Sequence, residues 1–315
     1  MVTKIADHNI YIGMGGWDLP PFQGKFYPKR TGRGFRKLEY YSRFFDFVEL
    51  NATFYKSTFT PANVRHWLDD VAANDRFTFS VKLFQGFTHT GQGTAHDLHN
   101  MLVIADAFTE GKRFEGFVMQ FPYSFSFSQQ RVEQIAALKE ALQPFTVFLD
   151  VRNGSWHSSA MLRFFAENKI HLINLDLPKI KNHFPFLNQS LDGLAYYRLM
   201  GRNAATWDAP YRAERNSKTV SSDRYSYDYS EEELLSIVKM LGSIRPKPLK
   251  SYVVFHNDPE ANSAKNGFQI RKILEPKSEI VVPATLKKTF DALKDYPTGG
   301  ATEPVDAVYT LFDKK

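Results

Sequence analysis

Short apolar runs alternate with amphipathic stretches along the chain. Each run is four to six residues long and rich in β-branched or aromatic residues, as is typical of strands that are buried on both faces. The pattern predicts eight strands, over residues 10–14, 47–50, 77–82, 116–121, 146–151, 171–175, 194–199 and 252–256.

The stretches between these runs carry helix signals of their own. Thr60 followed by Pro61 is typical of a helix start, and Ser230 with Glu233 forms a capping box. Each signal precedes apolar residues at helical spacing, and another such stripe lies over residues 98–108. The stripes indicate helix faces that pack against a core, and they do not indicate a cofactor-binding motif.

Eight strand–helix units predict an α/β fold that closes on itself as a single (β/α)8-type TIM barrel. An open doubly wound sheet normally uses five or six strands, so the last units would have no place in it. No repeat or long linker divides the chain, and we expect one domain over residues 1–315. The irregular stretch over 200–229 follows the seventh strand, where a loop of this length is typical of a lid or an insertion.

Composition narrows the function classes. The chain contains no cysteine, which excludes a disulfide scaffold, a thiolate metal site and a cysteine nucleophile. No segment has the features of a signal peptide or a membrane span, so we expect a cytoplasmic protein with no membrane partner. The formal net charge of +6 at pH 7 mildly favours anionic partners.

Polar side chains follow the ends of the predicted strands. In a barrel these ends converge on one mouth, where barrel enzymes place their active sites. A carboxylate beside a lysine or arginine at this mouth is suited to acid–base catalysis next to a charge clamp. We therefore expect catalytic roles for Glu49, Lys82 and Asp150. The candidate substrate-binding residues at the same mouth are Trp17, Asn51, Tyr55, Gln120, Arg152, Arg198, His256 and Asn257.

The sharpest expectation concerns Lys82 and Arg198. A buried cation is costly without a partner, so these residues predict either paired carboxylates or a bound anion. We expect them to form an anion-binding pair beside Glu49. The alternative is an internal ion-pair network that only neutralises polar groups at the mouth. The sequence assigns no metal ligand and names no cofactor.

The same strand ends resemble the YecE-like proteins, the family known as domain of unknown function 72. The most specific block is Glu49-Leu50-Asn51-Ala52-Thr53-Phe54-Tyr55, and other matching motifs follow in order along nearly the whole chain. The resemblance implies a barrel fold and no established reaction. The other motifs include Gly15-Gly16-Trp17, Phe79-Ser80-Val81-Lys82, Gln120-Phe121-Pro122, Asp150-Val151-Arg152, Tyr197-Arg198 and Phe255-His256-Asn257-Asp258.

Three positions depart from the pattern of that family. Asp150 stands where the family prefers Glu, Met200 where it has His before Gly201, and His256 where it has Asn. The missing histidine at position 200 puts in doubt any mechanism that relies on it. We expect His256, on the neighbouring strand, to reach the same mouth.

Three hypotheses for function remain open, and the sequence alone does not establish that the protein is an enzyme. The first is an enzyme that acts on a phosphate- or carboxylate-bearing small molecule. The second is a metal-dependent phosphodiester hydrolase with hard ligands for Mg²⁺, Mn²⁺ or Zn²⁺. The third is a non-catalytic nucleic-acid-binding barrel that uses the basic and aromatic side chains of 200–229. The candidate ligands of the second are Glu49, Asp150, Asp176, His256 and Asp258.

Overall fold

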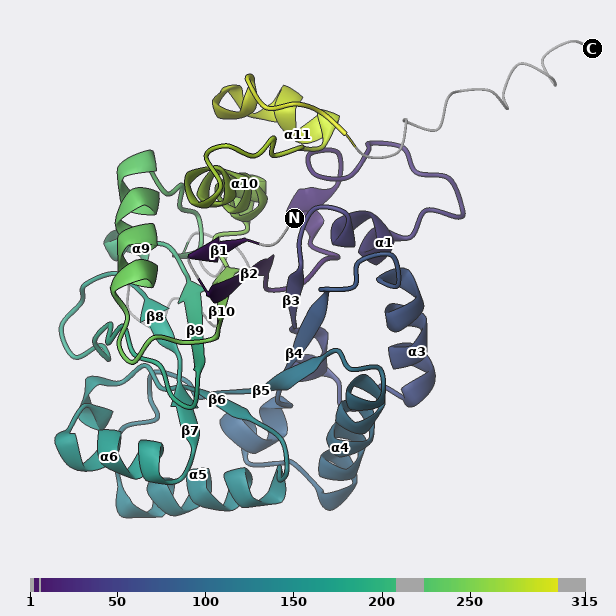
Figure 1. The fold of residues 1–315 in the computed structure, drawn as a ribbon. Coiled ribbons are helices and arrows are strands. Elements are labelled where there is room, and N and C mark those ends of the chain that lie inside the picture. Colours follow the sequence, from purple (N-terminus) through teal and green to yellow (C-terminus); the bar gives the residue numbers. More distant parts are fainter. Residues whose placement is uncertain (1–2, 6, 208–223, 300–315) are drawn as a thin grey trace, which may run out of the picture.

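Within the part of the chain that the structure describes, nine parallel strands form one sheet that closes into a barrel (Figure 1). The computed structural model describes residues 3–5, 7–207 and 224–299. A short strand β1 (Lys4–Ile5) pairs with β2 in the antiparallel direction. The parallel strands are β2 (His8–Met14), β3 (Phe47–Leu50), β4 (Thr78–Lys82), β5 (Phe114–Gln120), β6 (Val147–Asp150), β7 (Ile170–Leu172), β8 (Asn174–Asp176), β9 (Leu194–Leu199) and β10 (Lys250–Phe255).

The barrel closes where the sixth predicted strand is split in two. β7 pairs with β6, β8 pairs with β9, and Ile173 alone separates the two strands. The backbone N–H of Ile173 donates to the carbonyl of Leu149 at 2.9 Å, so the separating residue still contributes to the ladder. β7 and β8 therefore occupy one barrel position, and the predicted α/β barrel of eight strand positions is confirmed.

Helices surround the strands (Figure 1). The side chains of Thr60 and Asn63 cap α3, and Ser230 and Glu233 form the predicted capping box of α9. Single-turn 3₁₀ segments lie at 20–22, 154–156, 259–261 and 291–293, and a π turn lies at 86–90. The α-helices are α1 (Lys37–Ser42), α2 (Ala52–Tyr55), α3 (Pro61–Asp70), α4 (Ala95–Glu110), α5 (Gln129–Ala141), α6 (Ser159–Glu167), α7 (Ala204–Trp207), α9 (Glu231–Ser243), α10 (Asn262–Leu274) and α11 (Ala284–Thr289).

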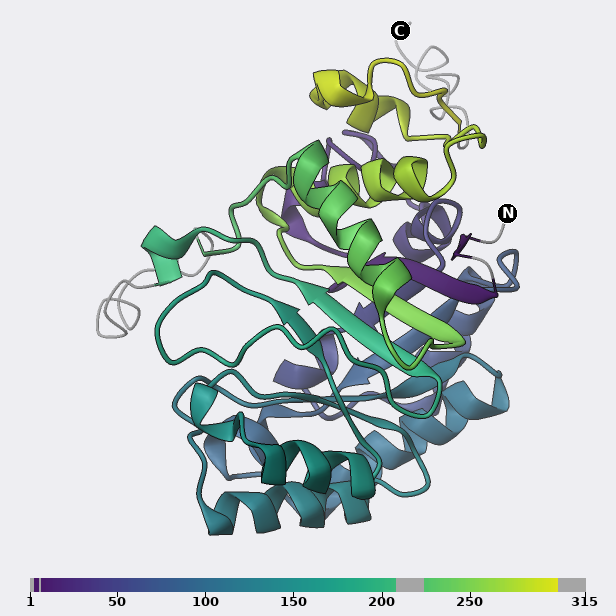
Figure 2. The same ribbon diagram turned by 60° about the vertical axis from the view of Figure 1, so that its left-hand side comes forward.

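The connection between β8 and β9 differs from the others. All of its residues, 177–193, are described, and no helix forms among them. Figure 2 shows this connection as a long loop. The sixth unit of the barrel therefore lacks the helix that usually covers a parallel strand.

Alternate residues of the strands point inward and fill the barrel with aromatic rings. The rings of Phe47, Phe148, Tyr196 and Tyr252 contact one another, with centroid separations from 4.8 Å to 5.9 Å. We call these four residues the aromatic floor. At Gly13 the backbone of β3 comes so close that an added Cβ would lie 1.9 Å from the carbonyl oxygen of Phe47. The interior is thus a packed core and not a pore.

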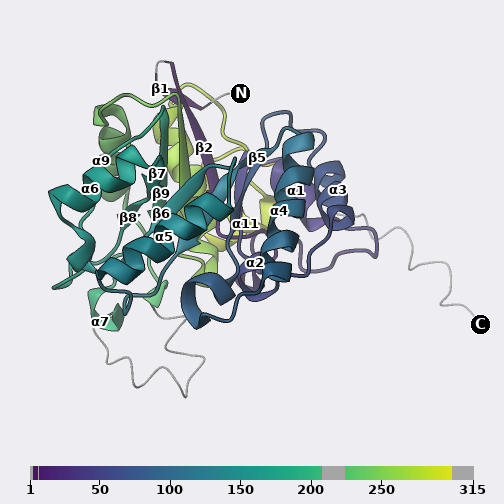
Figure 3. The same ribbon diagram turned by 90° about the horizontal axis from the view of Figure 1, so that it is seen from below.

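The two ends of the barrel are distinct. In Figure 3, α2 and α7 lie at one end and β1 at the other. Because α2 follows β3 and α7 follows β9, the first end is where the parallel strands finish. In the described part of the chain, no helix has the length and apolar character needed to cross a membrane.

Candidate functional site

A buried ionic cluster fills the C-terminal mouth of the barrel, centred on Arg198, which is 1% exposed. Its Nη2 donates to Glu49 Oε1 at 2.9 Å, and its Nε donates to His256 Nε2 at 3.1 Å. Its Nη1 donates to Gln120 Oε1 at 3.0 Å and also to Asp150 Oδ2. Side chains from four other strand ends therefore hold one guanidinium on β9.

Strand alternation explains why these side chains meet. Glu49 and Asp150 each follow an aromatic-floor residue by two positions, so they point into the barrel one layer above the rings. Arg198 stands in the same relation to Tyr196. The Tyr196 hydroxyl donates to Glu49 Oε2 at 2.8 Å and lies 2.9 Å from the hydroxyl of Ser80. The aromatic floor therefore donates a hydrogen bond to the cluster and also excludes water from the space beneath it.

The charges of the cluster stabilise one another. Burial favours the protonated form of Glu49, but the positive charge of Arg198 outweighs it and holds the pKa of this carboxyl well below its usual range. Burial likewise disfavours the charged form of Arg198, and the neighbouring Glu49 and Asp150 raise its pKa above the usual value. The cluster therefore keeps the Glu49 carboxylate and the Arg198 guanidinium ionised.

His256 reaches the mouth from the end of β10, as expected. Burial and the nearby Arg198 lower the pKa of His256 to about 4, so the ring is neutral at pH 7. Arg198 always donates, so Nε2 of His256 acts as the acceptor and the ring proton lies on Nδ1. The third position of the family pattern thus carries a neutral ring that helps to orient the arginine.

Lys82 lies at the end of β4, two residues after the inward-facing Ser80. Lys82 is 9% exposed, and its Nζ atom lies 4.1 Å from the centroid of the Phe54 ring. No hydrogen bond or ion pair joins this amine to another described residue. Burial and the positive charge of Arg198 lower the pKa of Lys82 to about 7.

The two cations of the expected anion-binding pair therefore have different surroundings. Arg198 uses its N–H groups on four protein side chains, which matches the ion-pair network foreseen as the alternative. The Lys82 amine forms no hydrogen bond or ion pair with another described residue. Of the two cations, Lys82 is therefore the one whose charged group has no polar partner in the described part of the chain.

Arg152 is the third cation of the mouth. Its Nε lies 3.4 Å from Asp150 Oδ1, and its guanidinium lies 5.8 Å from the centroid of the Trp207 ring. The side chain is 12% exposed. Glu49 and Asp150 balance only two of the three positive charges that Lys82, Arg152 and Arg198 carry when all are protonated.

The other predicted residues lie outside the network around Arg198. Asn51 Nδ2 donates to the carbonyl of Gly15 at 2.8 Å. Asn257 Nδ2 donates to Asn266 Oδ1 at 2.7 Å and to the carbonyl of Tyr227 at 2.9 Å. These two side chains thus fix loops at the mouth.

The two aromatic candidates face other neighbours. The ring of Trp17 packs edge-on against Trp67 of α3, with centroids 5.6 Å apart. Tyr55 is 72% exposed and contacts Phe54. Sequence reasoning missed Tyr196, although its position two residues before Arg198 on one strand was a signal that could have found it.

The described residues offer no metal site. No group of three or more His, Asp or Glu side chains within 3–5, 7–207 and 224–299 is placed to hold a metal ion. Glu49 and Asp150 both bind Arg198, and Asp176 accepts hydrogen bonds from Arg202 Nε at 2.9 Å and 3.0 Å. The metal-dependent hydrolase hypothesis therefore lacks its ligand set in this part of the chain.

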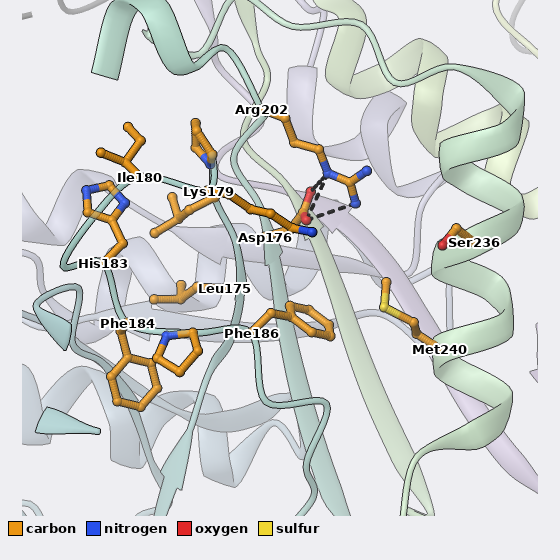
Figure 4. A pocket seen from close by; sticks show the side chains of 13 residues that line it. Leu175, Asp176, Lys179, Ile180, His183, Phe184, Phe186, Arg202, Ser236 and Met240 are labelled. Atoms are coloured by element: carbon orange, nitrogen blue, oxygen red, sulfur yellow. Dashed lines mark hydrogen bonds and ion pairs between the residues drawn. The ribbon is translucent and has the colours of Figure 1, made fainter. Parts of the chain in front are cut away.

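A cavity of about 940 Å³ opens beside the ionic cluster, between the β8–β9 loop and α9 (Figure 4). Asp176 and Arg202 form an ion pair in its wall, and most of the other lining side chains are apolar. Its lining contains none of the predicted catalytic and substrate-binding residues, although Asp176, a candidate ligand of the metal-dependent hypothesis, lies in its wall. The cavity lies where the helix of the sixth unit would otherwise cover the barrel, because no helix forms among residues 177–193. The lining includes Leu175, Ile180, Phe184, Phe186, Ser236 and Met240.

The predicted lid or insertion at 200–229 is only partly described. Residues 208–223 lie outside the described part of the chain. On either side of them, Trp207 and Tyr225 pack edge-on at 5.9 Å, and Trp207 Nε1 donates to the carbonyl of Arg224 at 3.1 Å. The two flanks of the segment thus meet beside Arg152.

The fold and the cluster define a (β/α)8 barrel protein with a buried ionic site at the C-terminal mouth. The sequence matches the family described as "Protein of unknown function DUF72" over residues 11–289, and the chain belongs to this family. The resemblance seen in the sequence is confirmed.

Relatives agree with this assignment. The chain is 28% identical over 291 residues to the UPF0759 protein YunF of Bacillus subtilis (strain 168), covering 88% of this chain and 99% of that protein. A DUF72 family protein from Thermotoga maritima MSB8 has a similar structure, with a TM-score of 0.71 and 27% identity, covering 84% of this chain and 99% of the other. A DUF72 family protein from Enterococcus faecalis V583, at 22% identity and a TM-score of 0.71 over 84% of this chain and 95% of the other, shares the fold.

Proposed function

We propose that the protein is an enzyme that acts on an anionic small molecule, bearing a phosphate or a carboxylate, at the C-terminal mouth of the barrel. The observation that supports this function is the charge balance of the mouth. Both carboxylates of the cluster bond Arg198, and Lys82 has no polar partner in the described part of the chain. A buried amine without a partner either loses its proton or is stabilised as a cation by an anion supplied from outside the protein, so an anionic substrate would favour its charged form.

Each charged residue of the mouth has its own role in the proposed reaction. Lys82, with its pKa lowered to about 7 by burial, is suited to exchange a proton near neutral pH. Arg152 contacts the anionic group, because its longer contact with Asp150 leaves its guanidinium less committed than that of Arg198. Glu49 and Asp150, which both bond Arg198, maintain the electric field in which the substrate reacts.

Thermal unfolding of the full chain tests this function. Inorganic phosphate and a panel of phosphorylated and carboxylated metabolites are compared with sodium chloride at equal ionic strength. We expect saturable stabilisation by at least one anion, of about 1.4 kcal/mol at tenfold excess over Kd. Lys82→Met and Arg152→Met weaken this effect.

Lys250→Met is the matched control, because Lys250 pairs with Glu115 at 3.1 Å at the start of β10, the opposite end of the barrel. We expect this variant to respond to anions as the unmodified chain does. The proposal fails when no anion stabilises the protein beyond chloride, or when Lys82→Met and Arg152→Met respond as strongly as the control.

A further inference from the structure

The surroundings of Lys82 suit an amine that reacts as a nucleophile as well as one that binds an anion through its charge. The carboxylates nearest in the cluster are bonded to Arg198, so no described acceptor holds the amine. The Phe54 ring covers one side of Nζ at 4.1 Å, which shields the amine from bulk water. An amine of this kind keeps its lone pair available for reaction.

We propose that the Lys82 amine forms an imine with the aldehyde or ketone carbonyl of an anionic substrate. This inference rests on the proposed function, because it concerns the same mouth and names the substrate class as a carbonyl compound that carries a phosphate or a carboxylate. In this arrangement the Lys82 amine reacts with the carbonyl carbon, and the Arg152 guanidinium binds the anionic group.

The reaction balances without an added oxidant or reductant. The nitrogen lone pair attacks the carbonyl carbon, and the carbonyl oxygen takes up a proton, giving a carbinolamine. The two hydrogens of the amine leave with that oxygen as one water molecule, and a C=N bond remains. When protonated, this imine withdraws electrons from the adjacent carbon, which favours loss of a proton or cleavage of a carbon–carbon bond there.

Two further features support the assignment. The pKa of Lys82, lowered to about 7 by burial and by Arg198, leaves much of the amine neutral at pH 7.5, as nucleophilic attack requires. The aromatic floor seals the barrel below the cluster, so water reaches the C=N bond only from the mouth. Limited access of water slows hydrolysis of an imine.

Borohydride trapping tests the inference. The full chain is incubated at pH 7.5 with pyruvate or dihydroxyacetone phosphate, reduced with sodium borohydride, and examined by intact mass and peptide mapping. We expect a single adduct on Lys82, formed roughly tenfold or more faster than on any exposed lysine. The rate at Lys82 rises with pH and levels off above about 7, whereas exposed lysines react faster up to about 10. Acetone, which has no charge, reacts more slowly.

Lys82→Arg keeps the positive charge and removes the nucleophile. Its response to inorganic phosphate in thermal unfolding reports whether the fold and the anion site are intact. Phosphate stabilisation of this variant together with loss of the adduct supports the imine. An adduct spread over exposed lysines, or equal labelling of the variant, overturns it.

The two proposals fail separately. Stabilisation by phosphate without any adduct on Lys82 overturns the imine and leaves the proposed function standing. An adduct on Lys82 that forms equally fast with acetone and with pyruvate, in a protein that no anion stabilises, supports the nucleophile and overturns the anionic substrate.

Discussion

Arg198 is central to the electrostatics of the mouth, because its guanidinium compensates the charge of two buried carboxylates. Glu49 and Asp150 are both 0% exposed, and each bonds a different Nη atom of the guanidinium. Removing one partner of a buried ion pair leaves charges that neither water nor protein compensates. The planar fork also fixes the directions of Gln120 and His256, which a lysine ammonium cannot do.

We therefore expect Arg198→Met to lower the free energy of unfolding at pH 7 by about 3–5 kcal/mol, measured by urea denaturation. Arg198→Lys also loses stability, since one ammonium cannot reach four acceptors. The triple variant Arg198→Met, Glu49→Gln, Asp150→Asn recovers part of the loss, because it no longer buries unpaired charge. If Arg198→Met is as stable as the unmodified chain, the ionic cluster does not have this role.

At the scale of elements, β2 and β3 approach each other closely at Gly13. An added Cβ at Gly13 would lie 1.9 Å from the Phe47 carbonyl oxygen, which is backbone and cannot move independently of β3. Gly242 in α9 has open space around its position. The two glycines therefore make a matched pair for substitution.

We expect Gly13→Ala to destabilise the protein by about 1–3 kcal/mol or more, because it forces β2 and β3 apart. Gly242→Ala has the opposite sign and stabilises by up to about 1 kcal/mol, since alanine favours the helix. Chemical denaturation of both variants measures the difference. Equal effects at the two positions contradict the close approach.

The elements that could be predicted are those whose signals are local. The caps at Thr60 and Ser230 were readable because both partners lie within three residues. The break at Ile173 could not be predicted, because a strand that changes its hydrogen-bonded neighbour has the same sequence pattern as a strand that does not. Periodicity also placed Glu49 and Arg198 at the mouth, but not the bonds between them.

Side-chain direction in the loops was beyond the sequence. Trp17 lies in the loop after β2 and Tyr55 is the last residue of the short helix α2 after β3, and their rings pack against Trp67 and Phe54. The residues of a strand alternate by rule, whereas those of a loop turn according to contacts that are distant in sequence. This explains why predictions on the strands were closer to the structure than those beyond them.

For the whole molecule, buried histidines control stability in acid. Burial lowers the pKa of His8, His89, His171 and His256 from 6.5 to about 4. Between these values the unfolded chain binds more protons, so stability falls as the pH falls from about 6.5 to 4. Burial raises the pKa of Asp258 from 3.8 to about 7, which acts in the opposite direction across that range but involves one proton against four.

We therefore expect the free energy of unfolding to decrease steadily between pH 6.5 and 4, as measured by urea denaturation at half-unit steps. His171→Gln reduces the steepness of this decrease, because it removes one buried titrating ring. His99→Gln, at an exposed position in α4, is the control and leaves the steepness unchanged. A profile that is flat over this range contradicts the burial of these rings.

The hydrogen-bond chain beneath the mouth has one more consequence. Tyr196 gives its only hydroxyl proton to Glu49, so the Ser80 hydroxyl must donate to Tyr196, and both residues are buried. The chain starts inside the packed barrel and has no inner end in water. It cannot act as a proton wire from the far side of the molecule. This hydrogen-bond chain therefore carries no proton between Glu49 and solvent at the far end of the barrel, and Glu49 exchanges protons on the side of the mouth.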